Sequence, residues 1–335
     1  MRGLTAALVV VAVVVSGCGD GGFDGGLERT TSSSDATTTT EVTTSSQPGL
    51  VDSAIVTAGP DGVQVISPEG TSTTVSTDPA AVAFGVGADV IVFQNADRAG
   101  GRFPAPGTGA VQVWTEGDVR ALAVGPSARR TLLLDAAMVE GAPLVLVAER
   151  FGEVGPDDTF EELVQIDLRE DTRTTIARRS AWESGHSAAR FLPDGDVVGV
   201  FSSEASVFLA RWTATGQQPI WTTQVGVDIH VDLALSDGEI TLIASSFDTG
   251  RNFTPVLRIA ERDTARGIEL SSNSVDVHDP EGEIDTGLFC WDWISPMALV
   301  CGRSSGKPIV ISLRDGSFEQ LPAQRESIPT VFRRA

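Results

Sequence analysis

Short apolar runs alternate with turn-forming residues along the chain from Leu50 onward. In the clearest example, one run ends at Leu192, Pro193-Asp194-Gly195 forms a turn, and a second run leads back. Runs of this length with Gly, Pro and Asp at the corners are typical of antiparallel strands joined by tight turns. The stretch therefore predicts a four-stranded meander, whose later strands are Val197 to Phe201, Val207 to Trp212 and Ile220 to Val225.

The same four-strand unit recurs along the chain, and no convincing amphipathic helix follows residue 50. Successive units lie about 45 to 55 residues apart. Their last strands are marked by Val75, Leu122, Ile176, Trp221, Leu270 and Leu321, the fifth being expected at Ile268 to Leu270. Four-stranded repeats of this length are typical of a β-propeller. We predict an all-β propeller of six blades, with seven blades as the second choice and two stacked sandwiches as the alternative architecture.

The first unit has room for only three strands between Leu50 and Val75. The chain also carries one spare strand at its end, from Ile328 to Arg333. Pairing this strand with the first unit would close the ring and protect both an open sheet edge and the chain terminus. We therefore expect the C-terminal strand to supply the inner strand of the first blade.

Two stretches resemble known propeller repeats. The corners Phe191-Leu-Pro-Asp-Gly-Asp-Val-Val198 and Leu235-Ser-Asp-Gly-Glu-Ile240 are similar to the strand–Asp-Gly–strand corners of TolB-like repeats. The segment Arg211-Trp-Thr-Ala-Thr-Gly-Gln-Gln-Pro-Ile-Trp221 resembles the repeat of pyrroloquinoline-quinone-type propellers. Such propellers host many unrelated functions, so the resemblance implies a fold and no activity. Counterparts of the quinone-binding residues are not identifiable.

The N-terminus has the order of an export signal. A positive start at Met1-Arg2 precedes an apolar run from Ala6 to Val15, and small residues then precede Cys18. This order is typical of a signal peptide, and the run is too short to span a bilayer as a mature helix. Val15-Ser16-Gly17-Cys18 resembles the lipobox of bacterial lipoproteins, which implies removal of residues 1–17 and acylation, as with palmitate, at Cys18. An ordinary secretory signal cut nearby, or a retained anchor, are the alternatives.

The segment from Cys18 to Gly49 has the composition of a tether. It is rich in Gly, Thr and Ser, which cannot bury a core, so we expect a disordered linker followed by a propeller domain at residues 50–335. A flexible linker of this length spans roughly 30 Å on average. The protein is thus predicted to face the extracytoplasmic side of a bacterial cell membrane through a lipid anchor.

Charge limits the range of partners. The 335 residues carry 24 Lys+Arg against 45 Asp+Glu, a formal charge of −21. Such a surface repels nucleic-acid backbones, so we exclude a nucleic-acid partner.

The two remaining cysteines, Cys290 and Cys301, lie on the first two strands of the sixth unit. An even number of cysteines in an oxidising compartment favours a disulfide, with two buried thiols as the alternative. The nearby Gly302-Arg-Ser-Ser-Gly306 formally matches a serine-hydrolase motif. That motif needs a helix after its turn, and none is expected here, so we interpret the segment as a hairpin loop.

All three histidines, His186, His230 and His278, precede the predicted inner strands of consecutive units, and Asp228 lies beside His230. In a propeller these connections share one end of the ring, so the side chains are candidates for a metal or ligand site. Scattered surface histidines are the competing interpretation. No cofactor is predicted beyond a divalent metal at this site, since no EF-hand or zinc spacing occurs.

Two classes of function remain. The first is an envelope binding or scaffold module that recognises a protein or a small ligand. The second is an enzyme of the hydrolase, lactonase or lyase type, or a small-molecule-binding protein, that uses the central channel. No catalytic set is identifiable in the sequence, which favours binding and leaves enzymatic activity undecided.

Overall fold

The computed structural model describes residues 54–87, 89–96, 109–125, 127–152, 160–180, 185–202, 206–224, 229–236, 239–247, 255–262, 271–276, 288–295, 298–303 and 306–332. These residues belong to the second of two compact units, Gln47–Ala335. The signal peptide, Cys18 and the linker lie outside them and stay predictions. No helix in the described ranges is long and apolar enough to cross a membrane.

The described residues form 24 strands in six four-stranded antiparallel sheets. In sheet order, the first is β24 (Ile328–Val331), β1 (Ile55–Gly59), β2 (Gly62–Ile66) and β3 (Ser72–Ser76), and the second is β4 (Ala80–Val86), β5 (Val90–Asn95), β6 (Val111–Thr115) and β7 (Asp118–Ala121). The third is β8 (Arg130–Val139), β9 (Ala142–Phe151), β10 (Phe160–Asp167) and β11 (Thr172–Ser180), and the fourth is β12 (Gly185–Phe191), β13 (Val197–Ser202), β14 (Ser206–Thr213) and β15 (Gly216–Gln224). The fifth is β16 (Ile229–Ser236), β17 (Glu239–Phe247), β18 (Pro255–Arg262) and β19 (Ser271–Asp276), and the sixth is β20 (Leu288–Ser295), β21 (Ala298–Arg303), β22 (Ile309–Ser312) and β23 (Phe318–Gln320).

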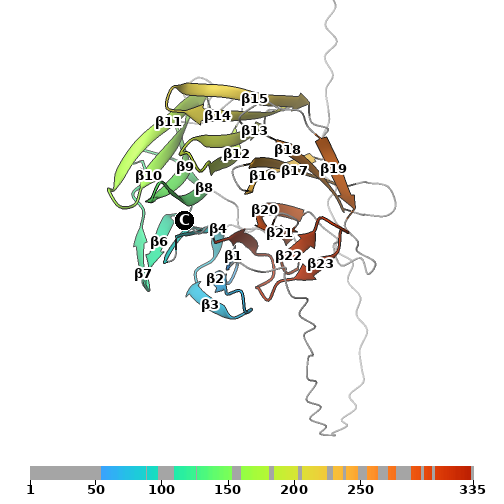
Figure 1. The fold of residues 1–335 in the computed structure, drawn as a ribbon. Helices are drawn as coiled ribbons and strands as arrows, with labels where there is room; N and C mark the ends of the chain where they lie inside the picture. Colours follow the sequence, from blue (N-terminus) through green and yellow to red (C-terminus); the bar gives the residue numbers. More distant parts are fainter. Residues whose placement is uncertain are drawn as a thin grey trace, which may run out of the picture. The chain divides into compact units, whose positions relative to one another are not determined.

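The sheets contact one another in a ring through their first strands. Strand β4 contacts β8, β8 contacts β12, β12 contacts β16, β16 contacts β20, and β20 contacts β24, which contacts β4. Figure 1 shows β4, β8, β12, β16 and β20 around the middle, with the later strands of each sheet farther out. The prediction of an all-β propeller is confirmed, and the ring of described strands has six sheets.

The C-terminal strand completes the first sheet. Strand β24 pairs antiparallel with β1, with Val331 opposite Ile55 and Ile328 opposite Ala58. The hydroxyl of Thr330 also donates a 2.6 Å hydrogen bond to the carbonyl of Ala83 on β4, in the next sheet. The expected closure by the terminal strand is therefore confirmed, because β24 bonds to sheets on both sides of the seam.

The core lies between neighbouring sheets. One cluster joins the second and third sheets through Val82, Val92, Val113, Val145 and Val164. Side chains alternate between the two faces of a strand, so each strand contributes every second residue to the core. Strand β6, for example, buries Val111 and Val113 and leaves Gln112 and Trp114 partly exposed. A second cluster joins the third and fourth sheets.

The meander that opens at Ala189 has the predicted corner. The amide of Gly195 donates to the carbonyl of Leu192, and Gly195 has a φ of 85°, which glycine adopts without steric cost. The Arg211 side chain from β14 bonds both Asp194 and Asp196 of this turn. The aspartates therefore act as turn residues, as expected.

The predicted boundaries of an outer strand, the last strand of the fifth sheet, were wrong. The last strand of the fifth sheet is Ser271–Asp276, whereas the apolar pattern placed it at Ile268 to Leu270. Outer strands have one edge in solvent and need little apolar surface, as the fully exposed β7 illustrates. Their sequences therefore carry only a weak periodic signal.

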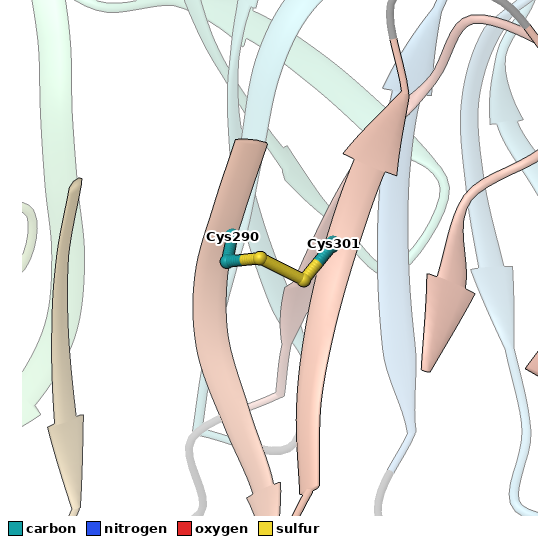
Figure 2. Close-up of a disulfide and its surroundings, with 2 residues drawn as sticks. All are labelled: Cys290 and Cys301. Atoms are coloured by element: carbon teal, nitrogen blue, oxygen red, sulfur yellow. A yellow bond between two sulfur atoms is a disulfide. The ribbon is translucent and has the colours of Figure 1, made fainter. Parts of the chain in front are cut away.

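Cys290 and Cys301 form a disulfide between β20 and β21. The two residues are directly opposite in the strand pairing, and Figure 2 shows the bond bridging the neighbouring strands. The predicted disulfide is confirmed. The interpretation of Gly302 to Gly306 as a hairpin loop agrees with the antiparallel pairing of β21 and β22.

Candidate functional site

The ring has two distinct ends, because successive strands of each sheet run in opposite directions. At one end, connections join first to second and third to fourth strands, and they include the two-residue turns 116–117 and 140–141. We call it the tight-turn end. At the other end, connections join second to third strands and one sheet to the next, including the longest ones, 96–110 and 277–287. We call it the long-connection end.

Acidic side chains gather at the tight-turn end. Glu116 and Glu140 each precede a glycine in a two-residue turn, with φ values of 50° and 48°. This left-handed region is uncommon for a residue with a side chain and suits the twist of a hairpin. Other described turns at this end carry Glu69, Asp89, Asp171, Asp194 and Asp315. The tight-turn end is therefore a negatively charged surface.

Two buried aspartates lie on inner strands. Asp135 on β8 is 0% exposed and accepts a 2.8 Å hydrogen bond from the amide of Phe191 on β12. Asp292 on β20 accepts a 3.1 Å hydrogen bond from the amide of Val331 on β24. Both residues directly follow an irregularity in the strand pairing, so they occupy equivalent places in their sheets.

These contacts supply hydrogen-bond acceptors at the unpaired edges of inner strands. An inner strand pairs with its own sheet along one edge only, and buried amides on the other edge need acceptors. Gln94 on β5 likewise bonds to the inner strand β8 of the next sheet. Its side-chain oxygen accepts from the amide of Leu133, and its side-chain nitrogen donates to the carbonyl of Thr131. The buried polar residues at these positions thus connect one sheet to the next.

Arg190 is a buried charge on the inner strand β12. Its side chain is 0% exposed and its Nη1 donates to the carbonyl of Leu134 on β8 at 2.5 Å. Its guanidinium lies 5.2 Å from the ring centre of Phe84 on β4, which favours a cation–π attraction. One arginine from β12 therefore contacts inner strands of two other sheets.

A further buried charge fixes a connection between sheets. Glu149 on β9 is fully buried and forms a 2.7 Å ion pair with Arg173 on β11. Its other oxygen accepts from the amide of Gly125, while Arg173 donates to the carbonyl of Ala123. The pair therefore holds the connection between the second and third sheets, which is a structural role.

For the predicted histidine site, the structure describes the backbone of His186 and His230. His186 and His230 are the second residues of β12 and β16. They lie within inner strands, so placing them in connections was wrong. The strands begin earlier than their apolar runs because a strand start tolerates polar residues. Both positions are at the long-connection end, on strands that contact each other. Asp228 and His278 lie outside the described residues.

Among the described side chains, no group of three or more His, Cys, Asp or Glu gathers as a metal site. The buried charges Asp135, Arg190 and Asp292 were missed by the sequence analysis. Their signal was present, since each interrupts an apolar inner strand: Leu-Leu-Asp-Ala-Ala, Ala-Ala-Arg-Phe-Leu and Cys-Trp-Asp-Trp-Ile. A charge within such a run indicates a specific buried partner.

No known family model matches the chain, and no curated protein matches its sequence. Solved structures resemble its fold. Hydrazine synthase from Kuenenia stuttgartiensis matches with a TM-score of 0.54 at 10% identity, covering 85% of this chain and 47% of that chain. AofleA from Arthrobotrys oligospora gives 0.46 at 12% identity, covering 85% and 91%. An exo-β-1,3-galactanase from Phanerochaete chrysosporium gives 0.43 at 10% identity, covering 74% and 59%. The chain spans about half the length of the hydrazine synthase chain, and likeness at this identity concerns the fold alone.

Proposed function

We propose that the protein is a lipid-anchored, extracytoplasmic β-propeller of the bacterial envelope that binds a partner protein at its long-connection end. The observation that carries this proposal is the place where the chain enters the ring. Strand β1 begins at Ile55, which pairs with Val331 at the end of β24. Both positions belong to the tight-turn end, because first strands run toward that end.

A tether that begins at Cys18 would therefore join the ring at its tight-turn end. The long-connection end would then carry no direct attachment to the anchor. Long connections carried on a rigid scaffold are also the usual place for binding residues.

The channel alternative has less support. Arg190 lies beside Phe84 and bonds to the carbonyl of Leu134, and Asp135 and Asp292 bond to backbone amides of the next sheet. These charged groups stabilise the ring. A catalytic or small-molecule role would need a further set of groups in the channel.

The test is a pull-down of the full-length, acylated protein from detergent-solubilised membranes of its own cell. We expect one envelope protein to be recovered in a fixed ratio. Added protein that lacks the tether should compete for this partner. A preparation that retains no protein but hydrolyses esters, lactones or glycosides would overturn the binding role in favour of the channel.

A further inference from the structure

Strand β24 is held by surfaces that a second copy of the chain also presents. It pairs with β1 and contacts β4 in the second sheet and β20 and β21 in the sixth. The hydroxyl of Thr330 donates to the carbonyl of Ala83, and the Phe332 ring lies where a side chain at Gly85 would be. Each of these contacts can therefore be made within one chain or between two copies.

The connection 321–327 links β23 to β24 and turns sharply at its end. The hydroxyl of Ser327 donates a 2.8 Å hydrogen bond to the carbonyl of Gln324. The Gln324 side chain bonds the amide of Asp61 and the carbonyl of Gly62, which lie between β1 and β2. The connection is thus folded back against its own ring. Fully extended, it would span about 23 Å, which is enough to reach the first sheet of an adjacent copy.

Glu326 in this connection has a left-handed backbone, with a φ of 55°. The other described non-glycine residues with a positive φ, Glu116, Glu140 and Asp171, lie in hairpin turns, whose twist favours this conformation. Glu326 lies instead between two sheets, where its amide donates a 2.6 Å hydrogen bond to the carbonyl of Gly306. The folded-back connection therefore holds one residue in a costly conformation, which an extended connection would relieve.

We infer that β24 exchanges between two copies of the chain, so that the C-terminal strand of each copy completes the first sheet of the other. The partner is a second copy of this chain, and the surface that receives its strand is the edge of β1 together with β4. Because β24 makes the same contacts in both forms, the connection decides the balance between them, and strain at Glu326 favours the exchanged form. This inference goes beyond the proposed function and does not depend on it.

A strand from an unrelated protein fits this edge less well. Any strand can supply backbone hydrogen bonds to β1. The side-chain contacts are more demanding, since they need a hydroxyl opposite the Ala83 carbonyl and a ring against Gly85. The β24 strand of a second copy carries both groups at the correct spacing, so the observations favour exchange between identical chains.

The experiment produces two differently tagged full-length copies in one cell, one carrying T57C and the other P329C. Thr57 is directly opposite Pro329, and proline has no amide hydrogen, so this is a non-hydrogen-bonded pair, in which side chains are closest. Exchange should give a disulfide-linked product that carries both tags on a non-reducing gel. The matched control pairs a V56C copy with a V65C copy. These positions are opposite on β1 and β2, which stay in one chain, so the control should give no linked product.

Two further variants keep the result interpretable if the first pair folds poorly. A single chain with T57C/P329C should form its disulfide, which shows that the two positions can bond. Copies that carry I55C and V331C, which are also opposite in this pairing, should give the same linked product as the first two copies.

Substitutions at Glu326 test the role of the connection. E326G adopts the left-handed conformation without steric cost, so linked product should fall about fivefold. E326V disfavours that conformation more than Glu does, so linked product should rise. The inference would be overturned by a disulfide confined to single chains, by equal linkage in the control copies, or by E326G and E326V shifting the linkage in the same direction.

Discussion

Single buried side chains join neighbouring sheets of this ring. Asp135, Asp292 and Gln94 accept hydrogen bonds from amides on an inner strand of the next sheet. An amide that loses such an acceptor in a buried place cannot turn to water, so the cost of removal exceeds the value of the bond itself. The stability of the ring therefore depends on these few polar residues as well as on its apolar core.

Replacing Asp135 by Ala should lower the free energy of unfolding by about 1 to 3 kcal/mol, because the amide of Phe191 loses its acceptor. Asp135→Asn retains a side-chain oxygen and should cost less. Urea unfolding of both variants measures the difference. Asp89→Ala in an exposed turn is the control and should change stability by less than about 0.5 kcal/mol. Equal effects of the three substitutions would contradict the role assigned to Asp135.

A second residue-scale effect concerns Asp315 in the turn between β22 and β23. The hydroxyl of Ser317 donates a 2.7 Å hydrogen bond to its carboxylate and lowers the pKa of Asp315, with Ser312 adding to the effect. A lowered pKa in the folded protein stabilises the turn above the ordinary pKa, and that stabilisation is lost as the pH falls through the lowered value.

Ser317→Ala should therefore raise the pKa of Asp315 toward its ordinary value. An NMR titration of the Asp315 carboxyl carbon in wild type and variant measures the shift. Glu69, whose pKa is lowered by a hydrogen bond with Ser67, serves as the internal control and should titrate unchanged. An Asp315 titration that is identical in the two proteins would rule out the hydrogen bond as the cause.

At the scale of strands, the first sheet carries the pairing that closes the ring, and the sixth sheet carries a disulfide. Strand β24 covers the edge of β1, and the disulfide links β20 to β21 in the adjoining sheet. An uncovered β1 would expose a row of backbone donors and acceptors, which favours fraying and association. The two constraints act on neighbouring sheets at the seam where the chain's first and last strands meet.

Truncation after Ser327 removes β24 and should abolish cooperative unfolding, since the loss is comparable to the whole stability of a domain, roughly 5 kcal/mol or more. Truncation after Phe332 leaves every paired residue of β24 and should behave as wild type. Thermal unfolding followed by circular dichroism, together with limited proteolysis, distinguishes the two. A stable, cooperative protein without β24 would show that closure is dispensable.

Removing the disulfide should have a smaller effect. The bond closes a short loop, with a sequence separation of 11, and such a cross-link stabilises by about 2 to 3 kcal/mol through the unfolded chain. The double variant C290A/C301A should therefore unfold at lower urea concentration while retaining its strands. Reduction of the wild type should reproduce the shift, and reduction of the variant should change nothing.

The sequence predicts this fold well where apolar runs and turn residues coincide, as at Val197 to Phe201 or at the Cys290 hairpin. It fails for outer strands such as Ser271–Asp276, which bury little apolar surface. It also misplaces the starts of β12 and β16, where polar residues such as His186 precede the apolar run. The buried contacts of Asp135 and Arg190 join different sheets, and pairing over such separations is not encoded in local periodicity.

At the scale of the whole molecule, the two ends of the ring differ in the connections that they carry. The tight-turn end carries acidic turns and the entry of the chain at Ile55, whereas the long-connection end carries the longest connections. A lipid anchor before Ile55 would hold the ring close to the membrane through its tight-turn end. The proposed function therefore depends on the modification of Cys18.

Metabolic labelling with an alkynyl palmitate tests this modification directly. We expect the wild type to be labelled and Cys18→Ser to lose the label, because the lipobox thiol is the acylation site. C290A/C301A should stay labelled, since the two cysteines that it replaces are paired with each other in the folded domain. Stable anchoring needs two acyl chains or one chain with a second signal. Cys18→Ser should consequently also leave the membrane fraction once its signal peptide is removed. Label or membrane retention that persists in processed Cys18→Ser would show that the protein is exported by an ordinary signal and held by other contacts.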